Sequence, residues 1–324
     1  MLWFLKIESM KRQVALVIII LWFCLFSCIP KSNKQSKKTG IELVVLGTVQ
    51  DAGSPQVGCE KECCKALLKS GLSDRMVVSL GLIDHDRNQQ YLFEATPNIS
   101  MQLAHLQRIS NLYQMPNGIF LTHAHIGHYT GLMYFGKEAM NCNKLPVFSM
   151  EQMQEFLTMN GPWDQLVKNE NIKLITLENE KAKVLDKNLT VTPILVPHRD
   201  EYSETVGYII SGNEKSALFI PDIDKWSKWE KDIITEIAKV DYAFIDGTFF
   251  SGVEIGHRDI AEIPHPSIEE SIQLFQPLSK NERKKIHFIH FNHTNPVLDR
   301  RSKEYKTIIK EGYHIAQKND RFEL

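Results

Sequence analysis

The sequence has no excess of charge of either sign. Its 324 residues include 38 Lys and Arg against 39 Asp and Glu, which gives a formal net charge of −1 at pH 7. A balance of this kind produces no strong field over the surface, so it gives no reason to expect nucleic acid or an anionic membrane as a partner. We therefore expect no nucleic-acid partner, and the composition does not indicate an oligomeric state.

The sequence also lacks internal repeats, long low-complexity runs and an apolar run of the length that spans a membrane. The apolar run from Val14 to Phe26 has about a dozen residues, whereas a membrane-spanning helix needs about 20. The hydrophobic content of 43% and the charged content of 24% are ordinary for a globular protein. By length alone, the chain forms one large domain or two smaller ones.

Residues 1–28 have the pattern of a secretory signal. Three basic residues precede the apolar run, namely Lys6, Lys11 and Arg12. A basic start, a short apolar segment and a small residue at its end are typical of such signals. The end of the run, Leu25-Phe26-Ser27-Cys28, resembles the lipobox of bacterial lipoproteins, in which the cysteine becomes the lipidated first residue. We predict a lipid on Cys28 and a location in a bacterial cell envelope, on the periplasmic side or the cell surface. An uncleaved amino-terminal anchor helix is the alternative.

Residues 29–40 are predicted to be a flexible linker. The segment from Pro30 to Gly40 is rich in Lys, Ser, Asn and Gln and has no apolar face to bury. The folded domain then covers residues 41–324. The chain could start at Met10 as well as at Met1, because two basic residues follow Met10 directly.

Local patterns predict strands and helices in this domain. The β-branched run from Ile41 to Gly47 is closed by glycine and predicts a buried strand. Residues 226–240 have the apolar spacing of one amphipathic helix. Residues 249–266 are rich in Gly and polar residues, so we expect a loop that covers the substrate, with His257 and His265 in it.

A cluster of three histidines follows the apolar stretch Ile119 to Leu121. His123 and His125 are two residues apart, so in extended backbone their side chains point the same way and can bind one ion. His128 lies past the strand and can face a second ion. Neutral imidazole is a good ligand for zinc, iron or manganese, so the cluster predicts a metal site at a strand end. A polar loop that happens to be rich in histidine is the alternative.

The segment from Thr122 to His128 resembles the His-x-His-x-Asp-His motif of metallo-β-lactamase-fold hydrolases, with Gly127 at the position of the aspartate. The family's remaining metal ligands have matches near the ends of later strands, at His198, Asp222 and His290. The resemblance covers nearly all of the chain from residue 41 onward. It implies an α/β fold, the αββα sandwich, in which two mixed β-sheets are flanked by helices.

Within this superfamily the chain is most similar to the pyrroloquinoline quinone biosynthesis protein B group. Two stretches carry that likeness: Leu46 to Gln56 together with Cys59, and His290 to Pro296. In the first stretch, Asp51 is expected beside the metal site, although a plain turn residue would explain it equally well.

The superfamily resemblance implies two metal sites that share one carboxylate. Site one would use His123, His125 and His198, and Asp222 would bridge to site two. His128 and His290 complete site two; His287, three residues before His290 on one strand, would face the opposite way.

Gly127 leaves site two without its usual carboxylate. The protein could bind one ion tightly, or it could recruit Asp51, Asp200 or Asp224. We expect Asp222, Asp51 and His293 to take part in catalysis. Asp246 also ends a strand and is expected to orient a ligand histidine from outside the metal's own ligands.

Three thiols, Cys59, Cys63 and Cys64, lie within six residues. The related biosynthesis proteins carry a similar cluster that resembles a structural zinc site, although no fourth ligand is visible nearby in the sequence. In an exported protein a disulfide is the competing outcome, and Cys142 adds another thiol. We favour zinc and keep both alternatives.

These residues predict an exported, membrane-tethered, metal-dependent hydrolase. A metal held by three histidines with an open position lowers the pKa of bound water toward about 7. The expected cofactor is Zn²⁺, one or two ions, with Fe or Mn also suitable. The hydroxide would attack an ester, lactone, amide or phosphodiester bond of a small-molecule substrate. The alternatives are an iron-dependent, oxygen-using enzyme related to quinone cofactor biosynthesis, and a catalytically inactive tethered binding protein.

Overall fold

The computed structural model describes residues 3, 7, 10, 38–71, 73–256 and 259–324. The chain divides into two units, Met1–Lys38 and Thr39–Leu324, and the fold described below is that of the second unit. All of the predicted signal except residues 3, 7 and 10 lies outside the described residues, as do Cys28, nearly all of the linker and His257. Within the described part of the chain, no helix combines the length and the apolar character that crossing a membrane requires.

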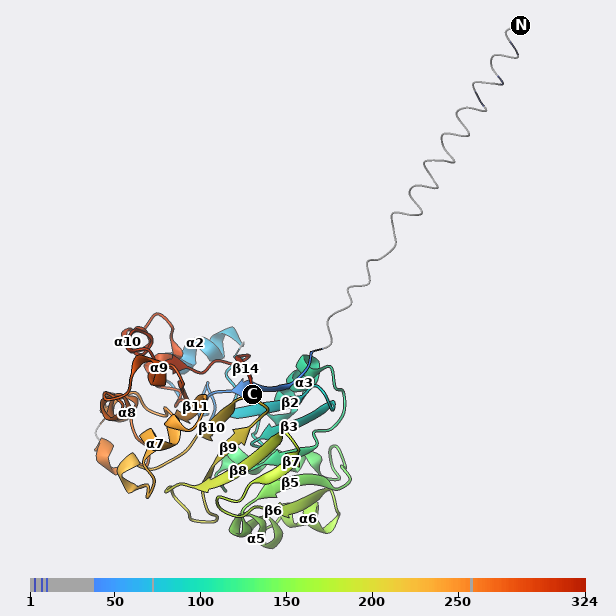
Figure 1. Ribbon diagram of the computed structural model, residues 1–324, viewed down its shortest axis with the longest axis horizontal. Coiled ribbons are helices and arrows are strands. Elements are labelled where there is room, and N and C mark those ends of the chain that lie inside the picture. Colours follow the sequence, from blue (N-terminus) through green and yellow to red (C-terminus); the bar gives the residue numbers. More distant parts are fainter. Residues whose placement is uncertain (1–2, 4–6, 8–9, 11–37, 72, 257–258) are drawn as a thin grey trace. The chain divides into compact units, whose positions relative to one another are not determined.

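Two mixed sheets of seven strands each form the centre of the domain (Figure 1). The first sheet has the order β14-β1-β2-β3-β4-β5-β6. Its strands are β1 (Ile41–Gly47), β2 (Ser79–Asp84), β3 (Gln89–Phe93), β4 (Gly118–Phe120), β5 (Leu145–Ser149), β6 (Ile172–Thr176) and β14 (Arg321–Glu323). The second sheet has the order β13-β12-β11-β10-β9-β8-β7. Its strands are β7 (Lys183–Asp186), β8 (Leu189–Leu195), β9 (Val206–Ser211), β10 (Ser216–Ile220), β11 (Tyr242–Asp246), β12 (Ile286–Ile289) and β13 (His314–Ile315).

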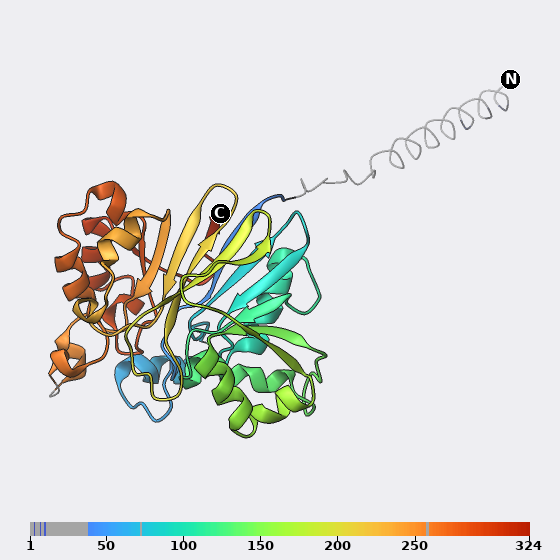
Figure 2. The same ribbon diagram turned by 60° about the horizontal axis from the view of Figure 1, so that its bottom comes forward.

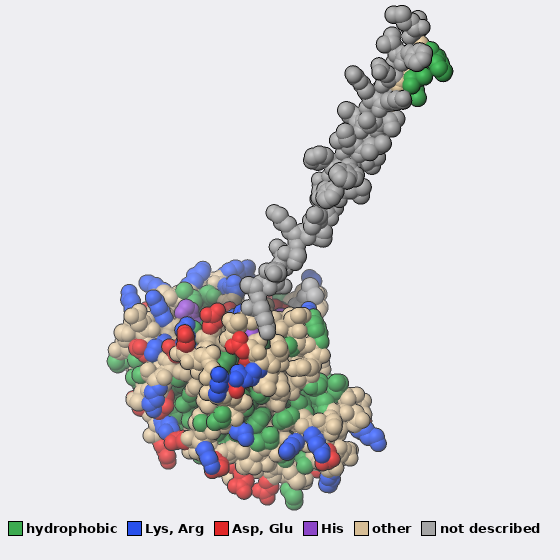
Figure 3. All heavy atoms as spheres, turned by 45° about the vertical axis from the view of Figure 1, so that its right-hand side comes forward, with side chains coloured by type: hydrophobic (Ala, Val, Ile, Leu, Met, Phe, Trp, Pro, Cys, Tyr) green, Lys and Arg blue, Asp and Glu red, His purple; other side chains and the backbone are tan. Residues whose placement is uncertain are grey.

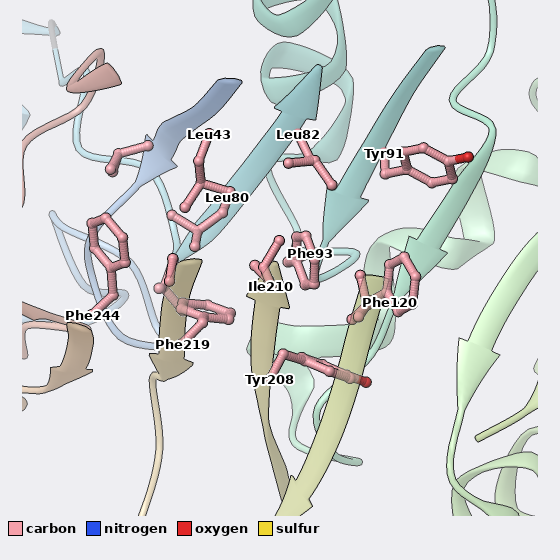
Figure 4. Close-up of a cluster of buried hydrophobic side chains, with 14 of the residues drawn as sticks. Leu43, Leu80, Leu82, Tyr91, Phe93, Phe120, Tyr208, Ile210, Phe219 and Phe244 are labelled. Atoms are coloured by element: carbon pink, nitrogen blue, oxygen red, sulfur yellow. The ribbon is translucent and has the colours of Figure 1, made fainter. Parts of the chain in front are cut away.

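The inner faces of the two sheets pack on each other (Figure 4). Phe93 and Phe120 of the first sheet contact Tyr208 of the second, with ring centroids 5.5 and 5.7 Å from the tyrosine ring. Strand β1 is buried along its whole length because Leu43 faces this inner core while Val44 faces the outer one. A strand covered on both sides needs a continuous apolar sequence, which is why the run from residue 41 predicts it correctly.

Helices cover the outer face of each sheet (Figure 2), which confirms the αββα sandwich. The helices of the domain are α2 (Glu62–Ser70), α3 (Ile99–Ser110), α4 (Ile126–Tyr129), α5 (Glu151–Met159), α6 (Trp163–Lys168), α7 (Ile233–Ala238), α8 (Ile268–Leu274), α9 (Lys280–Arg283) and α10 (Lys303–Glu311). Five 3₁₀ segments add to them: η1 (Thr130–Phe135), η2 (Trp226–Lys228), η3 (Gly252–Ile255), η4 (Ile260–Glu262) and η5 (Pro296–Leu298).

The single helix predicted over residues 226–240 is wrong. The structure has the short segment η2 and then α7, which begins after Asp232. The Asp232 side chain accepts a hydrogen bond from the backbone N–H of Ile234 and caps α7 there. A capping aspartate satisfies N–H groups that a continuous helix would use internally, so the chain starts a new helix at this point.

One edge of the sandwich gathers the loops that follow several strands. Strands β3 and β4 run parallel to each other in the first sheet, as do β10, β11 and β12 in the second. Val49, just after β1, forms a bridge with Phe291, just after β12, and so joins the two sheets at this edge. On the face seen in Figure 3, acidic and basic side chains are interspersed, in keeping with the balanced composition.

Candidate metal centre

Three histidines and one aspartate from three separate loops form the first donor set: His123, His125, His198 and Asp222. One donor atom of each lies within 4.8 Å of the others. Nε2 of His123 lies 2.8 Å from Nδ1 of His125 and 3.5 Å from Oδ2 of Asp222. Nε2 of His198 lies 3.6 Å from Oδ1 of Asp222. Tetrahedral ligands about 2.1 Å from zinc stand roughly 3.4 Å from one another, so these residues fit one ion.

The orientation of His123 is set by Thr122 and Glu94. The Thr122 hydroxyl donates its proton to Oε1 of Glu94 at 2.7 Å, so it can only accept from Nδ1–H of His123 at 2.8 Å. That leaves the lone pair of Nε2 facing the other donors. Outer partners that fix the tautomer in this way are typical of metal-bound histidines.

His125 turns the opposite ring nitrogen toward the donor set. Its Nε2 lies 3.3 Å from Oε2 of Glu201 and 3.4 Å from Nη2 of Arg199, at the exposed side of the site. Nδ1 is therefore the atom available to an ion.

The second donor set consists of Asp51, His128, Asp222 and His290. Nε2 of His128 lies 3.0 Å from Oδ1 of Asp51 and 3.1 Å from Oδ2 of Asp222. Nε2 of His290 lies 3.1 Å from the same oxygen of Asp222. Asp222 belongs to both sets, so it occupies the bridging position that the sequence predicts.

His290 is oriented by the same kind of relay as His123. Its Nδ1 lies 2.8 Å from the Thr248 hydroxyl, which donates to Asp246 at 2.7 Å. Asp246 thus reaches His290 through Thr248, and its role in orienting a metal ligand stays a prediction. Glu94 and His290 both have left-handed backbone angles, with φ of 76° and 67°. Such angles are uncommon for residues other than glycine and concentrate at functional sites.

The electrostatics of the two sets differ. Burial and the neighbouring His128 hold the pKa of His123 well below its usual value, so this imidazole is neutral, as a ligand must be. Burial also opposes the charged form of His128, but Glu94, Asp222 and Asp51 outweigh it and raise its pKa well above the usual value. Burial likewise opposes the charged form of His290, yet the carboxylates, Asp222 foremost, raise its pKa to about 10. Positive charge is thus stabilised at the second set, where a divalent cation would replace the protons.

Several buried polar atoms of the centre lack a hydrogen-bond partner among the described residues. They are both ring nitrogens of His198, both carboxylate oxygens of Asp222 and Nε2 of His290. Leaving a buried polar atom unsatisfied costs about 1–3 kcal/mol, and native proteins seldom tolerate it without a reason. Metal coordination supplies one for Nε2 of both histidines and for Asp222, so the residues present fit a metal cofactor.

A third donor set contains Cys59, Cys63, Cys64 and His293, again within 4.8 Å of one another. His293 therefore offers the fourth donor that the sequence did not reveal. Its Nδ1 lies 3.0 Å from Oδ1 of Asn292, which leaves Nε2 for the thiols. All three cysteines are free, and Cys142 packs against the outer core of the first sheet, away from them. Three thiols and one imidazole suit a structural zinc ion.

The position of His293 corrects its predicted catalytic role. The chain turns sharply at His290 and forms the loop up to Asn295, whose backbone N–H bonds to the carbonyl of Asn292. His290 thus points into the second donor set while His293, three residues later, joins the thiols. Residues 46–59 and 290–296, the two stretches that resemble the biosynthesis protein B group, meet in the structure. Their shared likeness was therefore an indication that His293 lies near the thiols.

Three functional side chains escaped the sequence reasoning: Glu94, Thr122 and Thr248. Glu94 is fully buried at the end of β3, and an acidic residue closing an apolar strand was the available signal. His265, in the predicted covering loop, is buried as well. Its Nδ1 lies 2.7 Å from Oδ2 of Asp246 and 3.3 Å from Oδ1 of Asp222.

Comparisons with known proteins show the family of the chain and agree with its fold. A family model described as the beta-lactamase superfamily domain matches residues 89–291, well over half of the chain. Coenzyme PQQ synthesis protein B of Nitrosococcus oceani is 24% identical over 307 residues, which cover 84% of this chain and 96% of the relative. The same protein of Klebsiella pneumoniae is 22% identical over 298 residues, covering 84% and 94%.

Two solved structures resemble the fold. Zn²⁺-bound PqqB from Methylobacterium extorquens superimposes with a TM-score of 0.71 at 20% identity, covering 87% of this chain and all of that one. A diphosphatase from the PhnP family gives a TM-score of 0.62 at 19% identity, covering 88% and 98%. At these identities the likenesses establish the fold.

Proposed function

The chain belongs to the beta-lactamase superfamily, and we propose that it is a metal-dependent hydrolase of a small-molecule ester-type bond. The observation that carries the proposal is the pair of donor sets that share Asp222. Two adjacent ions bridged by a carboxylate are a recurrent arrangement for hydrolysis, because one activates water while both stabilise charge on the reacting group.

The residues divide the work between them. His123, His125 and His198 would hold the first ion, and His128 and His290 would hold the second together with Asp222. When bound, the metal supplies a hydroxide nucleophile near neutral pH. Asp222 keeps the two donor sets in register, and the buried walls exclude competing water.

His265 and Asp246 are suited to proton transfer. Burial disfavours the charged imidazole, but Asp246 and Asp222 raise the pKa of His265 above its usual value and favour the protonated form. Asp246 fixes the ring through Nδ1, and the ring lies against His198 with centroids 5.2 Å apart. In the proposed reaction His265 gives a proton to the leaving group while Asp246 stabilises the imidazolium.

Among the candidate bonds, we favour a phosphodiester or related phosphate ester. The likeness to a diphosphatase supports a substrate that carries phosphoryl groups. Arg199, beside His125 at the exposed edge of the site, supports it as well, because guanidinium groups bind phosphate oxygens well.

The test is a substrate panel on the protein reconstituted with zinc, manganese or iron. We expect turnover of a chromogenic phosphodiester that a chelator abolishes and that His123→Ala lacks. Esters, lactones and β-lactams serve as comparison substrates. A wild-type protein that binds less than about one ion per chain beyond the Cys-bound zinc would rule out the hydrolase. Full metal content without turnover on any substrate would point to the inactive binding protein.

A second candidate is an iron-dependent, oxygen-using enzyme. The relatives named as PQQ synthesis proteins match along 84% of the chain, and imidazole with carboxylate donors also suits iron. Oxygen consumption by the iron-loaded protein, absent with zinc, would favour this function over hydrolysis.

We further propose that the enzyme is tethered to a bacterial envelope through Cys28. The basic and apolar pattern of residues 1–28 supports this proposal. Labelling of cells with a radioactive fatty acid should mark the wild-type chain and not Cys28→Ala. Equal labelling of both, or of neither, would reject the anchor.

A further inference from the structure

The second donor set contains a carboxylate that the sequence motif lacks. The motif aspartate is replaced by Gly127, so the segment that carries His128 offers no carboxylate of its own. The structure nevertheless places a second carboxylate there beside Asp222, because Asp51 arrives from the loop that follows β1.

Gly127 is the residue that makes this approach possible. A Cβ atom built at Gly127 would lie 2.4 Å from Oδ1 of Asp51 and 2.6 Å from its Cα. Contacts below 3.0 Å do not occur at real Cβ atoms, and here one of the two atoms belongs to the backbone. Rotation of the Asp51 side chain could not relieve that contact. Any residue other than glycine at position 127 would therefore push the Asp51 loop away.

Asp51 is held at the site by its own backbone neighbours. Gln50 donates its N–H to the carbonyl of Phe291 at 2.9 Å, and Phe291 donates to the carbonyl of Thr48 at 2.8 Å. Phe291 directly follows His290, so these bonds fix Asp51 relative to a histidine of the same donor set. Oδ1 of Asp51 lies 3.7 Å from Nε2 of His290.

The other carboxylates that could have been recruited are bound elsewhere. Asp200 accepts a hydrogen bond from the Thr205 hydroxyl at 2.7 Å. Asp224 pairs with Lys228 at 2.7 Å. Within the described residues, neither belongs to a group of potential metal ligands.

We propose that Asp51 takes the place of the missing motif aspartate as a ligand of the second ion. Gly127 is needed because any side chain at this position would collide with Asp51. This inference rests on the proposed function, since it concerns the same metal centre. It makes the second ion dependent on the loop after β1, whereas the first ion depends on no residue of that loop.

The test compares Asp51→Asn with Asp200→Asn, a matched change at a carboxylate outside the donor sets. Each protein is reconstituted with zinc, and the ions per chain are counted by mass spectrometry and titrated against a chelator. Cobalt substitution separates the sites, because thiolate charge-transfer bands report the Cys ion and ligand-field bands report the others. We expect Asp51→Asn to lose one of the ions not bound by thiolate, or to bind it at least about 10-fold more weakly. Asp200→Asn should retain it.

Gly127→Ala is the second variant, and it should lose the same ion although it removes no donor atom. If it fails to fold, Asp51→Asn alone decides the outcome. Asp51→Asn with wild-type metal content and affinity would overturn the inference while leaving the hydrolase proposal intact. A wild-type protein that binds no ion outside the thiol cluster would instead overturn both. Loss of the ion from both aspartate variants alike would also reject Asp51 as its specific ligand.

Discussion

The two donor sets of the metal centre are assembled in different ways. The first takes His123, His125 and His198 from positions at which the sequence motif places them. The second takes Asp51 from a loop more than 70 residues before His128, into space left by a glycine. If Asp51 binds the second ion as proposed, a vacant motif position does not mean a vacant coordination position, because a distant loop supplies the same chemistry.

Removing a ligand of the first set should have the largest effect. His198→Ala should lose the first ion and lower kcat/KM by more than about 100-fold, since loss of an outer partner alone typically costs 10–100-fold. Steady-state kinetics on the phosphodiester substrate and a metal count give the measurement. Wild-type kcat/KM in this variant at saturating zinc would show that the first set does not support catalysis.

Removing a thiol from the cluster should affect the second donor set more than the first. Cys63→Ser should lose the thiolate-bound ion and lower Tm by several degrees, since each kcal/mol lost shifts Tm by about 2–4 °C in a large domain. Because Cys59 follows the loop that carries Asp51, the affinity for the second ion should fall more than that for the first. Cys142→Ser is the control, with metal content unchanged. Equal metal content and Tm in both variants would contradict a structural zinc.

The carboxylates behind the histidines should also distinguish the sets. Glu94 contacts both Thr122 and His128, so Glu94→Gln should weaken both ions, each by about 10–100-fold. Asp246 reaches His290 through Thr248, contacts His265, and accepts the backbone N–H of Ile223, which directly follows Asp222. Asp246→Asn should therefore weaken the second ion more than the first, as chelator competition would show. Identical metal profiles for the two variants would argue against separate relays.

His287 gives the smallest effect, and it is a control for His290 because it lies in β12 while His290 directly follows that strand. Burial, with a contribution from His314, lowers the pKa of His287 to about 3. The unfolded chain therefore binds a proton first, near pH 6.5, so the wild type loses stability as the pH falls from there toward 3. His287→Phe lacks this titration. Between pH 7 and pH 5, its free energy of unfolding should therefore fall by up to about 2 kcal/mol less than that of the wild type.

The measurement for His287 is urea unfolding of both proteins at the two pH values, so that effects of the metal centre cancel in the difference. Metal content should not change in His287→Phe. Parallel stability profiles, or loss of an ion from this variant, would contradict the burial of His287 outside the donor sets.

The fold and the first donor set were accessible from the sequence because their signals are local or follow the order of a known motif. A continuous apolar run reports burial on both faces, as in residues 41–47. Three histidines within residues 123–128, directly after an apolar stretch, predict a metal site at the end of a strand. These patterns need no knowledge of what packs across from them.

The remaining features depend on contacts between distant segments. The fourth ligand of the thiol cluster, His293, lies more than 220 residues after Cys64. The choice among Asp51, Asp200 and Asp224 depended on which loop reaches Gly127, a distance that no spacing in the sequence encodes. The division of residues 226–240 into two helices depended on one capping side chain, Asp232.

Anomalous X-ray scattering at the zinc absorption edge, from crystals of the zinc-loaded protein, tests the two-ion centre most directly. We predict one peak among His123, His125 and His198 and a second among Asp51, His128 and His290, with Asp222 contacting both and ligand distances of about 2.0–2.2 Å. Crystals with no peak at either position, or with a second peak that Asp51 does not contact, would contradict this assignment.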